Sequence, residues 1–479
     1  MTPARHRLPG TEAAPPAGTG PPATTREAGH RAGVPLYGPE FAADPHDLYD
    51  RLRRHYGEVA PVELAPGVHA WLVLGYYAAL EVLRSPHLYS KDPRTWRALA
   101  CGEVPADSSV IPMMGYRPNA LFSDPPAHDR YRQAIADSLA RIDDHVLHTS
   151  VARTADRLIA SFASRGRADL LIEYAAVLPV LTVNALFGQA DDAGPRLVAA
   201  LAKMFEGGED AIEGDRLFTR YMIDLIASKR DRPGPDVTSW LMAHPARLSD
   251  EEMIHQCTLL IAASAEPVQN LIGNALRLLL ADDRFAGDLS GGIMSIEAAL
   301  EQVLWQEPPM ANYAVHYPRR DLVLRGATLR AGDPVVVSLA AANIDPALNP
   351  AASRAGNRAH LAFSAGPHAC PAKDPARRIA TIAIERLLDT LSDVRLTVPA
   401  TDLQWRMGPF QRALTALPVH FTPVHPPAIG DPTWTPSPLP PAPSASTPPA
   451  PTSTARPPAS APPDRPRGWN FRAAFRRGR

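Results

Sequence analysis

The chain has 479 residues, of which 45% are apolar, and its formal net charge is −1 at pH 7. This length and composition allow a large hydrophobic core, and the balanced charge argues against a nucleic-acid or strongly acidic partner. The three cysteines, Cys101, Cys257 and Cys370, lie far apart, which argues against a disulfide framework. No apolar run reaches the ~18 residues of a membrane span, and the first residues show no signal-peptide pattern. We therefore expect a cytoplasmic protein.

Proline distinguishes the two ends of the chain from its middle. Many of the 53 prolines fall near the ends, where apolar periodicity is missing, so these segments cannot bury enough surface to fold. We expect disordered tails at 1–34 and 425–479 around one folded domain at 35–424. Residues 465–479 interleave arginines with aromatic side chains, a pattern that suits weak contact with an anionic membrane or an acidic partner. A solvated tail explains that pattern equally well.

Helical periodicity dominates the expected domain. A first helix is predicted at 44–57, and two strands are predicted within 59–75 around a Pro-Gly turn. Short strands are expected again within 321–341. The other amphipathic helices are expected at 76–86, 130–147, 154–166, 173–188, 250–283, 295–305 and 376–391. The predicted fold class is mainly α with a small β portion.

A cysteine in a loop of small residues marks the most informative segment, HLAFSAGPHACPAKDPARRIA at 360–380. Cys370 precedes an expected helix, whose positive end stabilises a thiolate, and Gly366 suits a tight turn. A buried structural cysteine is the plain alternative. A Cys–His nucleophile with His368 is weak, because side chains two residues apart point away from each other in extended chain. A zinc site lacks further cysteine ligands at a suitable spacing.

The pattern Phe363-x-x-Gly366-x-His368-x-Cys370 resembles the haem-binding loop of the cytochrome P-450 family, the haem-thiolate monooxygenases. The resemblance extends along the whole expected domain, including the long apolar helix at 250–283. It implies the cytochrome P-450 fold, which agrees with the mainly α class predicted from periodicity.

The resemblance also implies a cofactor, haem b, and the residues that hold it. Cys370 would supply the axial thiolate ligand of the iron. The stretch DPPAHDRYR places His128 and Arg132 at i and i+4, on one helix face. Together with His316 and His368, these two residues would contact the haem propionates.

The family's chemistry implies dioxygen, electrons from NAD(P)H through a ferredoxin and a ferredoxin reductase, and an apolar small-molecule substrate. Behind the cysteine, Lys373, Arg377 and Arg378 would form a basic face for the acidic ferredoxin. A solvated helix face explains these three residues nearly as well.

The long helix departs from the family at the acid–threonine pair, because Glu266 is followed by Pro267. A proline supplies no hydroxyl and leaves the carbonyl of Ala263, four residues earlier, without its helical donor. Ser264 and Glu266 remain as candidates for carrying protons to dioxygen, directly or through water.

A second departure concerns the family's Glu-x-x-Arg brace, where this chain has Gln302 and Trp305 within EQVLW. We expect the Gln302 amide oxygen to accept a hydrogen bond from the Trp305 indole, at little desolvation cost. A subset of actinobacterial members carries a similar Glu-Gln-x-Leu-Trp stretch, so one brace would replace another.

Three functions follow from these residues. The first is a haem-thiolate monooxygenase that inserts one oxygen atom into an apolar molecule. The second is a haem protein of the same fold with a sensing or scaffolding role, suggested by the missing threonine. The third is a peroxide-driven enzyme, which needs less of the proton relay.

Overall fold

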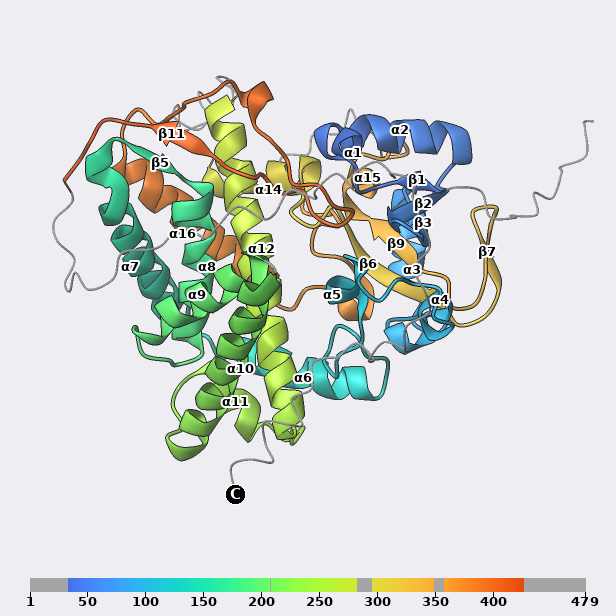
Figure 1. Cartoon of the computed structure of the whole chain (residues 1–479), viewed down its shortest axis with the longest axis horizontal. Helices are drawn as coiled ribbons and strands as arrows, with labels where there is room; N and C mark the ends of the chain where they lie inside the picture. Colours follow the sequence, from blue (N-terminus) through green and yellow to red (C-terminus); the bar gives the residue numbers. More distant parts are fainter. Residues whose placement is uncertain (1–32, 207, 282–294, 349–356, 426–479) are drawn as a thin grey trace, which may run out of the picture. The chain divides into compact units, whose positions relative to one another are not determined.

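The structure is a computed structural model that describes residues 33–206, 208–281, 295–348 and 357–425 (Figure 1). The expected tails at 1–34 and 425–479 fall almost entirely outside these residues, as does the basic-aromatic segment 465–479. Among the described residues, no helix is long and apolar enough to cross a membrane.

Helices make up most of the described chain, which confirms the predicted mainly α class. Their bounds are α1 Pro39–Ala43, α2 Pro45–Tyr56, α3 Tyr76–Leu83, α4 Arg97–Ala100, α5 Ile111–Met114, α6 Ala127–Leu139, α7 Asp144–Phe162, α8 Val177–Leu186, α9 Ala193–Glu206, α10 Gly208–Asp231, α11 Val237–Ala243, α12 Asp250–Ala281, α14 Ile296–Gln306, α15 Leu339–Asn343 and α16 Lys373–Thr390.

Three sheets form the β portion of the described residues. The largest has the strand order β1-β2-β3-β9-β6-β4, and the others are β10-β11-β5 and β7-β8. The expected hairpin is β2 with β3, where Val59 lies opposite Val73. The bounds are β1 Val34–Pro35, β2 Val59–Ala65, β3 Val68–Val73, β4 Tyr89–Ser90, β5 Arg167–Asp169, β6 Asn312–Pro318, β7 Leu322–Leu324, β8 Ala327–Leu329, β9 Val335–Ser338, β10 Arg395–Leu396 and β11 Pro418–His420.

The single helix expected at 130–147 is wrong, because the structure forms two helices there. α6 ends at Leu139 and α7 begins after Asp143, whose carboxylate accepts the backbone N–H groups of His145 and Val146. This side-chain cap satisfies N–H groups that open a helix. Apolar periodicity on both sides concealed the break, since both helices bury one face.

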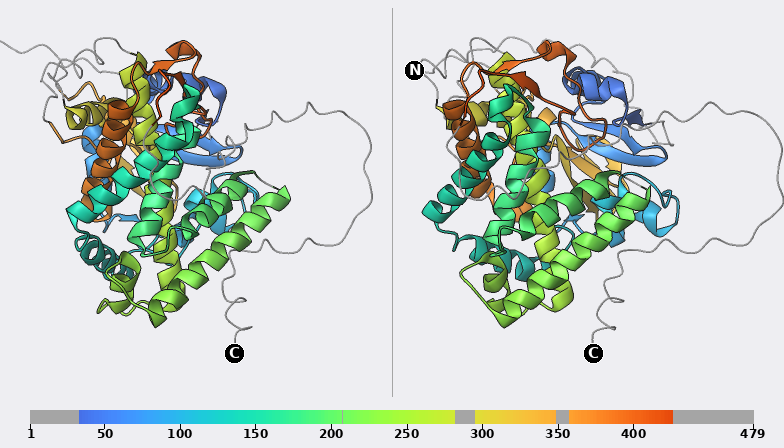
Figure 2. Two further views of the ribbon diagram at one scale, coloured as in Figure 1. Left: turned by 90° about the vertical axis from the view of Figure 1, so that its left-hand side faces the viewer. Right: turned by 60° about the vertical axis from the view of Figure 1, so that its left-hand side comes forward.

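The long helix α12 runs through the helical part of the molecule and packs against α8 and α16 (Figures 1 and 2). Its start has the reciprocal capping box, because the N–H of Ser249 donates to Glu252 Oε2 (2.8 Å) and the N–H of Glu252 donates to Ser249 Oγ (3.2 Å). The helix continues through Pro267 to Ala281.

A buried arginine near the carboxyl-terminal part of the described chain joins segments that are far apart in sequence. Arg412 Nη1 donates to the carbonyl of Ala42, 370 residues earlier, at 2.5 Å. Arg412 Nε pairs with Glu307 at the end of α14 over 2.8 Å. These contacts connect three parts of the chain around one guanidinium group.

Candidate functional site

The Cys370 loop is held by its own backbone and by close packing on α3. The Cys370 N–H donates to the carbonyl of Phe363 (2.9 Å), and the Ala369 N–H donates to the carbonyl of Gly366 (3.0 Å). Gly366 has φ +71°, and a Cβ there would lie 2.1 Å from the carbonyl oxygen of Leu83. Both the backbone conformation and the close approach therefore require glycine at this position.

The sulfur of Cys370 lies just before α16 in a mixed electrostatic environment. Burial raises the pKa of the Cys370 thiol, whereas the Ala372 N–H and the Arg132 guanidinium act in the opposite direction. A bound metal cation deprotonates a coordinating thiol outright. The loop thus presents one cysteine that suits ligation of a metal.

Four residues expected at the propionates converge beside this loop. His128 and Arg132 come from α6, His316 from β6, and His368 from the Cys370 loop. The rings of His128 and His368 have centroids only 3.9 Å apart. Burial, helped by the positive charges around it, lowers the pKa of His368 well below its ordinary value. The site therefore concentrates groups that attract an anion.

Lys91 is a fifth basic residue in this cluster, close to His368, and no sequence pattern indicated it. Its side chain is buried, and Nζ donates to the carbonyl of Val315 at 2.7 Å. Burial lowers the pKa of Lys91 to about 7, although Asp124 acts in the opposite direction. Within YSKDPR the residue resembles an exposed turn lysine, so only the fold reveals its burial.

The cluster fits a dianion such as a haem with its two propionates. His128 Nδ1 lies 3.2 Å from Asp129 Oδ1, whereas its Nε2 is buried without a hydrogen-bond partner. Arg132 forms no hydrogen bond or ion pair with any described residue. Asp124, a carboxylate in the same region, already pairs with Arg319 (2.7 Å) and accepts from Ser90. A half-buried guanidinium and imidazole N–H groups can all donate hydrogen bonds, so the cluster suits an anionic ligand.

Helix α12 leaves small side chains uncovered at its middle. Ala262 and Ala263 are exposed, although most residues on either side along α12 are buried. The Ser264 hydroxyl donates to the carbonyls of Leu260 (2.7 Å) and Ile261 (3.0 Å). Its hydrogen is therefore already bonded to the helix backbone.

The second proposed proton carrier also has a partner. The Glu266 carboxylate forms an ion pair with Arg406 from the carboxyl-terminal segment, and Arg406 donates in addition to Gln411 Oε1 (2.7 Å). Any proton transfer by Glu266 would thus require exchange of this ion pair.

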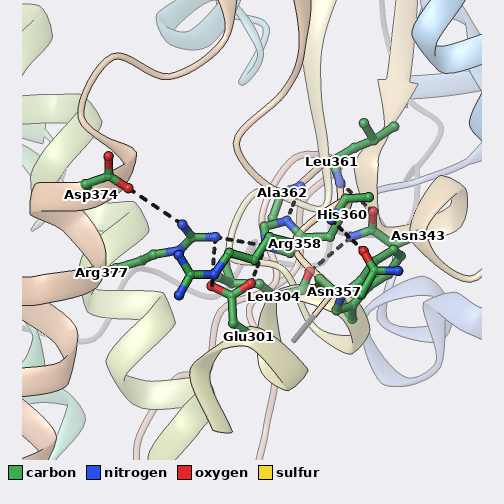
Figure 3. A network of polar contacts seen from close by, with 12 residues as sticks. Glu301, Leu304, Asn343, Asn357, Arg358, His360, Leu361, Ala362, Asp374 and Arg377 are labelled. Carbon is green, nitrogen blue, oxygen red and sulfur yellow. Dashed lines mark hydrogen bonds and ion pairs between the residues drawn. The ribbon is translucent and has the colours of Figure 1, made fainter. Parts of the chain in front are cut away.

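The brace near the loop differs from the expected Gln302–Trp305 hydrogen bond. Trp305 is buried and its indole Nε1 donates to the carbonyl of Asn357 at 2.8 Å, so the expected bond is wrong. No described residue bonds to the Gln302 amide. The segment before the Cys370 loop passes beside α14 (Figure 3), which brings the carbonyl of Asn357 within reach of the indole.

The neighbouring Glu301 takes the central position in this region. Its Oε2 lies 3.0 Å from His360 Nε2 and its Oε1 lies 2.7 Å from Arg377 Nη2 (Figure 3). Arg377 therefore points inward, with a side chain only 15% exposed. Its expected place on a basic docking face is wrong, whereas Lys373 and Arg378 are exposed.

We expect Trp305→Ala to destabilise the protein by ~3–5 kcal/mol, because it removes a large buried aromatic side chain and the bond to Asn357. Trp305→Phe should cost less, since it keeps most of the volume and loses one hydrogen bond of about 1 kcal/mol. Denaturant unfolding of the two variants measures both values. Equal stability of Trp305→Ala and the native protein would contradict this stabilising role of Trp305.

Comparison with known proteins places the chain among characterised relatives, although no protein-family model matches it. It is 32% identical over 396 residues to the cytochrome P-450 monooxygenase PikC of Streptomyces venezuelae, covering 80% of this chain and 92% of that protein. It is 29% identical over 400 residues to the vitamin D(3) 25-hydroxylase of Pseudonocardia autotrophica, covering 81% and 96%.

Solved structures show the same similarity. Testosterone-bound CYP154C4 from a Streptomyces species matches with a TM-score of 0.72 and 28% identity, covering 81% of this chain and 98% of that one. CYP154A1 from Streptomyces coelicolor A3(2) matches with a TM-score of 0.70 and 28% identity, covering 81% and 100%.

Proposed function

The chain belongs to the cytochrome P-450 family, and we propose that it inserts one oxygen atom into an apolar small molecule with electrons delivered by a ferredoxin. Proteins of this family use haem b, dioxygen and electrons derived from NAD(P)H. When bound through a cysteine thiolate, haem supplies the activation of dioxygen. The observation that carries the proposal is the buried basic cluster beside the Cys370 loop.

We assign the cofactor contacts to individual residues. The Cys370 thiolate binds the iron, and the loop shape set by Phe363 and Gly366 holds it in place. The propionates are bound by the basic cluster, which consists of His128, Arg132, His316, His368 and Lys91. These groups come from α6, β6, the Cys370 loop and the segment after β4.

Proton supply is assigned to Glu266, with Ser264 in a supporting position. The ion pair with Arg406 fixes the position of the carboxylate. When this ion pair opens, Glu266 relays a proton that enters from bulk solvent towards the exposed face of Ala263. Ser264 accepts a water hydrogen bond at its hydroxyl oxygen while it donates to Leu260.

The substrate class is inferred from apolar surroundings and from relatives. The exposed stretch of α12 offers alanine methyl groups at Ala262 and Ala263. One relative is named for its action on vitamin D(3), and one similar structure holds testosterone. Both are large apolar molecules, which supports an apolar substrate here. The relatives are named as monooxygenases and hydroxylases, so no observation favours the sensing or peroxide-driven alternatives.

Turnover with defined electron sources tests this function. The haem-loaded protein should oxidise an apolar compound, identified by its shift of the haem spectrum, when ferredoxin, reductase and NAD(P)H are all present. Product formation with hydrogen peroxide alone, and none with the redox proteins, would overturn the proposed electron supply. Spectral binding of many apolar compounds with no oxidation by either route would overturn the proposed activity.

The docking face for ferredoxin gives a separate prediction. Lys373→Glu with Arg378→Glu should raise KM for ferredoxin about 10-fold, because opposite charges steer and hold the acidic partner. The effect should shrink as salt screens the charges. Arg216→Glu with Arg220→Glu on α10, whose side chains are 68% and 73% exposed, serves as the charge-matched control. Equal KM changes in both variants would argue against a specific face.

A further inference from the structure

One buried carboxylate contacts both flanks of the Cys370 loop. Glu301 lies on the buried face of α14, with its side chain 10% exposed. Its two oxygens are divided between His360, ten residues before the cysteine, and Arg377, seven residues after it. A second arginine, Arg358, lies 3.9 Å from Oε1. Figure 3 shows these side chains converging on Glu301.

The hydrogen bonds indicate which ring nitrogen of His360 carries the proton. The Ala362 N–H donates to His360 Nδ1 (3.2 Å), so the ring proton is on Nε2 and is donated to Glu301. Arg377 is then the close counter-charge of the carboxylate. Burial acts to raise the pKa of Glu301, but His360 and the two arginines outweigh it, and the pKa lies below its ordinary value. The carboxylate is therefore ionised in the folded protein.

The same partners lead to the sulfur. The His360 ring lies 5.9 Å from the Phe363 ring, and the Arg377 guanidinium carbon lies 5.1 Å from the centroid of that ring. The carbonyl of Phe363 accepts the Cys370 N–H. Glu301 thus fixes two groups that contact Phe363, and Phe363 fixes the backbone of the cysteine.

We propose that Glu301 is the positioning residue for the Cys370 loop, in place of the Glu and Arg pair that the family usually has at 302 and 305. This inference rests on the proposed haem site. It also explains the indole at 305, whose ring packs edge-on against His360 with centroids 5.8 Å apart. An arginine at 305 would add a buried cation beside Arg377 and Arg358, which already share the one carboxylate.

Glu301→Gln tests the proposal, because it keeps the size of the side chain and removes the charge that holds Arg377. Loss of groups that orient a metal ligand typically weakens metal binding 10- to 100-fold. We expect haem to transfer to an acceptor such as apomyoglobin about 10-fold or more faster than from the native protein. The reduced carbon monoxide complex should also lose part of its thiolate-type absorption.

Three further variants separate positioning from general stability. Glu297→Gln changes an exposed carboxylate on the same helix, and Gln302→Ala changes the neighbouring residue, so both should behave as the native protein. Glu301→Gln with Arg377→Met removes both charges, and should restore thermal stability without restoring the thiolate spectrum. Recovery of both properties in this double variant would reduce Glu301 to a stabilising role and overturn the proposal.

Two other results would also overturn it. One is a Glu301→Gln variant whose haem transfer and spectrum equal those of Glu297→Gln, and the other is a larger loss in Gln302→Ala. Failure of the haem site itself is distinguishable, because then the native protein would show no thiolate-type spectrum.

Discussion

Cys370→Ala is expected to remove thiolate ligation of haem completely, so that the reduced carbon monoxide complex loses its characteristic long-wavelength absorption. The thiolate is the ligand that distinguishes this family's iron from that of other haem proteins. Within the described chain, Cys370 is the cysteine beside the basic cluster. It follows His368 in the same loop, and the nearby Arg132 guanidinium acts to lower the pKa of its thiol. Oxygen insertion should fall below detection, since no other group at this position can supply the anionic sulfur.

The two other cysteines provide matched controls. Cys257 is buried on α12, and burial raises the pKa of its thiol to about 12, so it stays protonated and inert. Cys101 is exposed at the end of α4. Cys257→Ala and Cys101→Ala should both keep the native spectrum. A native spectrum in Cys370→Ala, with loss in either control, would show that the ligand was assigned to the wrong residue.

Glu266→Gln is expected to lower the rate of product formation by ~100-fold or more, the usual contribution of a positioned acid–base group. NAD(P)H consumption should fall less, because dioxygen that receives electrons without well-timed protons leaves as hydrogen peroxide. Pro267→Thr supplies a hydroxyl and a backbone N–H one residue further along α12. It should raise the ratio of product to NAD(P)H consumed, measured with any compound that the native protein oxidises.

Substitution of Arg406 distinguishes a role of Glu266 in proton supply from a purely structural role of its ion pair. Arg406→Met leaves the Glu266 carboxylate in place but removes its partner. If Glu266 carries protons, this variant keeps or raises product formation, whereas Glu266→Gln strongly lowers it. Equal losses in the two variants would mean that the ion pair matters and the proton route lies elsewhere.

Local sequence was sufficient for features that depend on a few neighbouring residues. The turn at Gly366 follows from the spacing of the loop, and His128 and Arg132 share a face because four residues make about one helical turn. The capping box at Ser249 is equally local, since both hydrogen bonds lie within the first turn. Each of these predictions needed no knowledge of distant chain segments.

The features that the sequence missed depend on distant partners. Lys91 is buried because β6 covers it and offers the Val315 carbonyl, 224 residues away. Trp305 bonds not to Gln302 but to Asn357, which lies 52 residues further along the chain. Arg377 looked like a surface cation, but Glu301 from another helix draws it inward. Spacing along one helix cannot show which of its side chains will meet a partner from elsewhere.

The contact between Arg412 and Ala42 has a consequence for how the protein is made. During synthesis the amino-terminal segment leaves the ribosome first, yet the carbonyl of Ala42 receives its guanidinium donor only after residue 412 has emerged. The packing of the amino-terminal helices is therefore incomplete until almost the entire described chain has been synthesised. The same arginine binds Glu307, which ends the helix that carries Glu301. The packing around α14 is therefore completed only after the whole Cys370 loop has been synthesised.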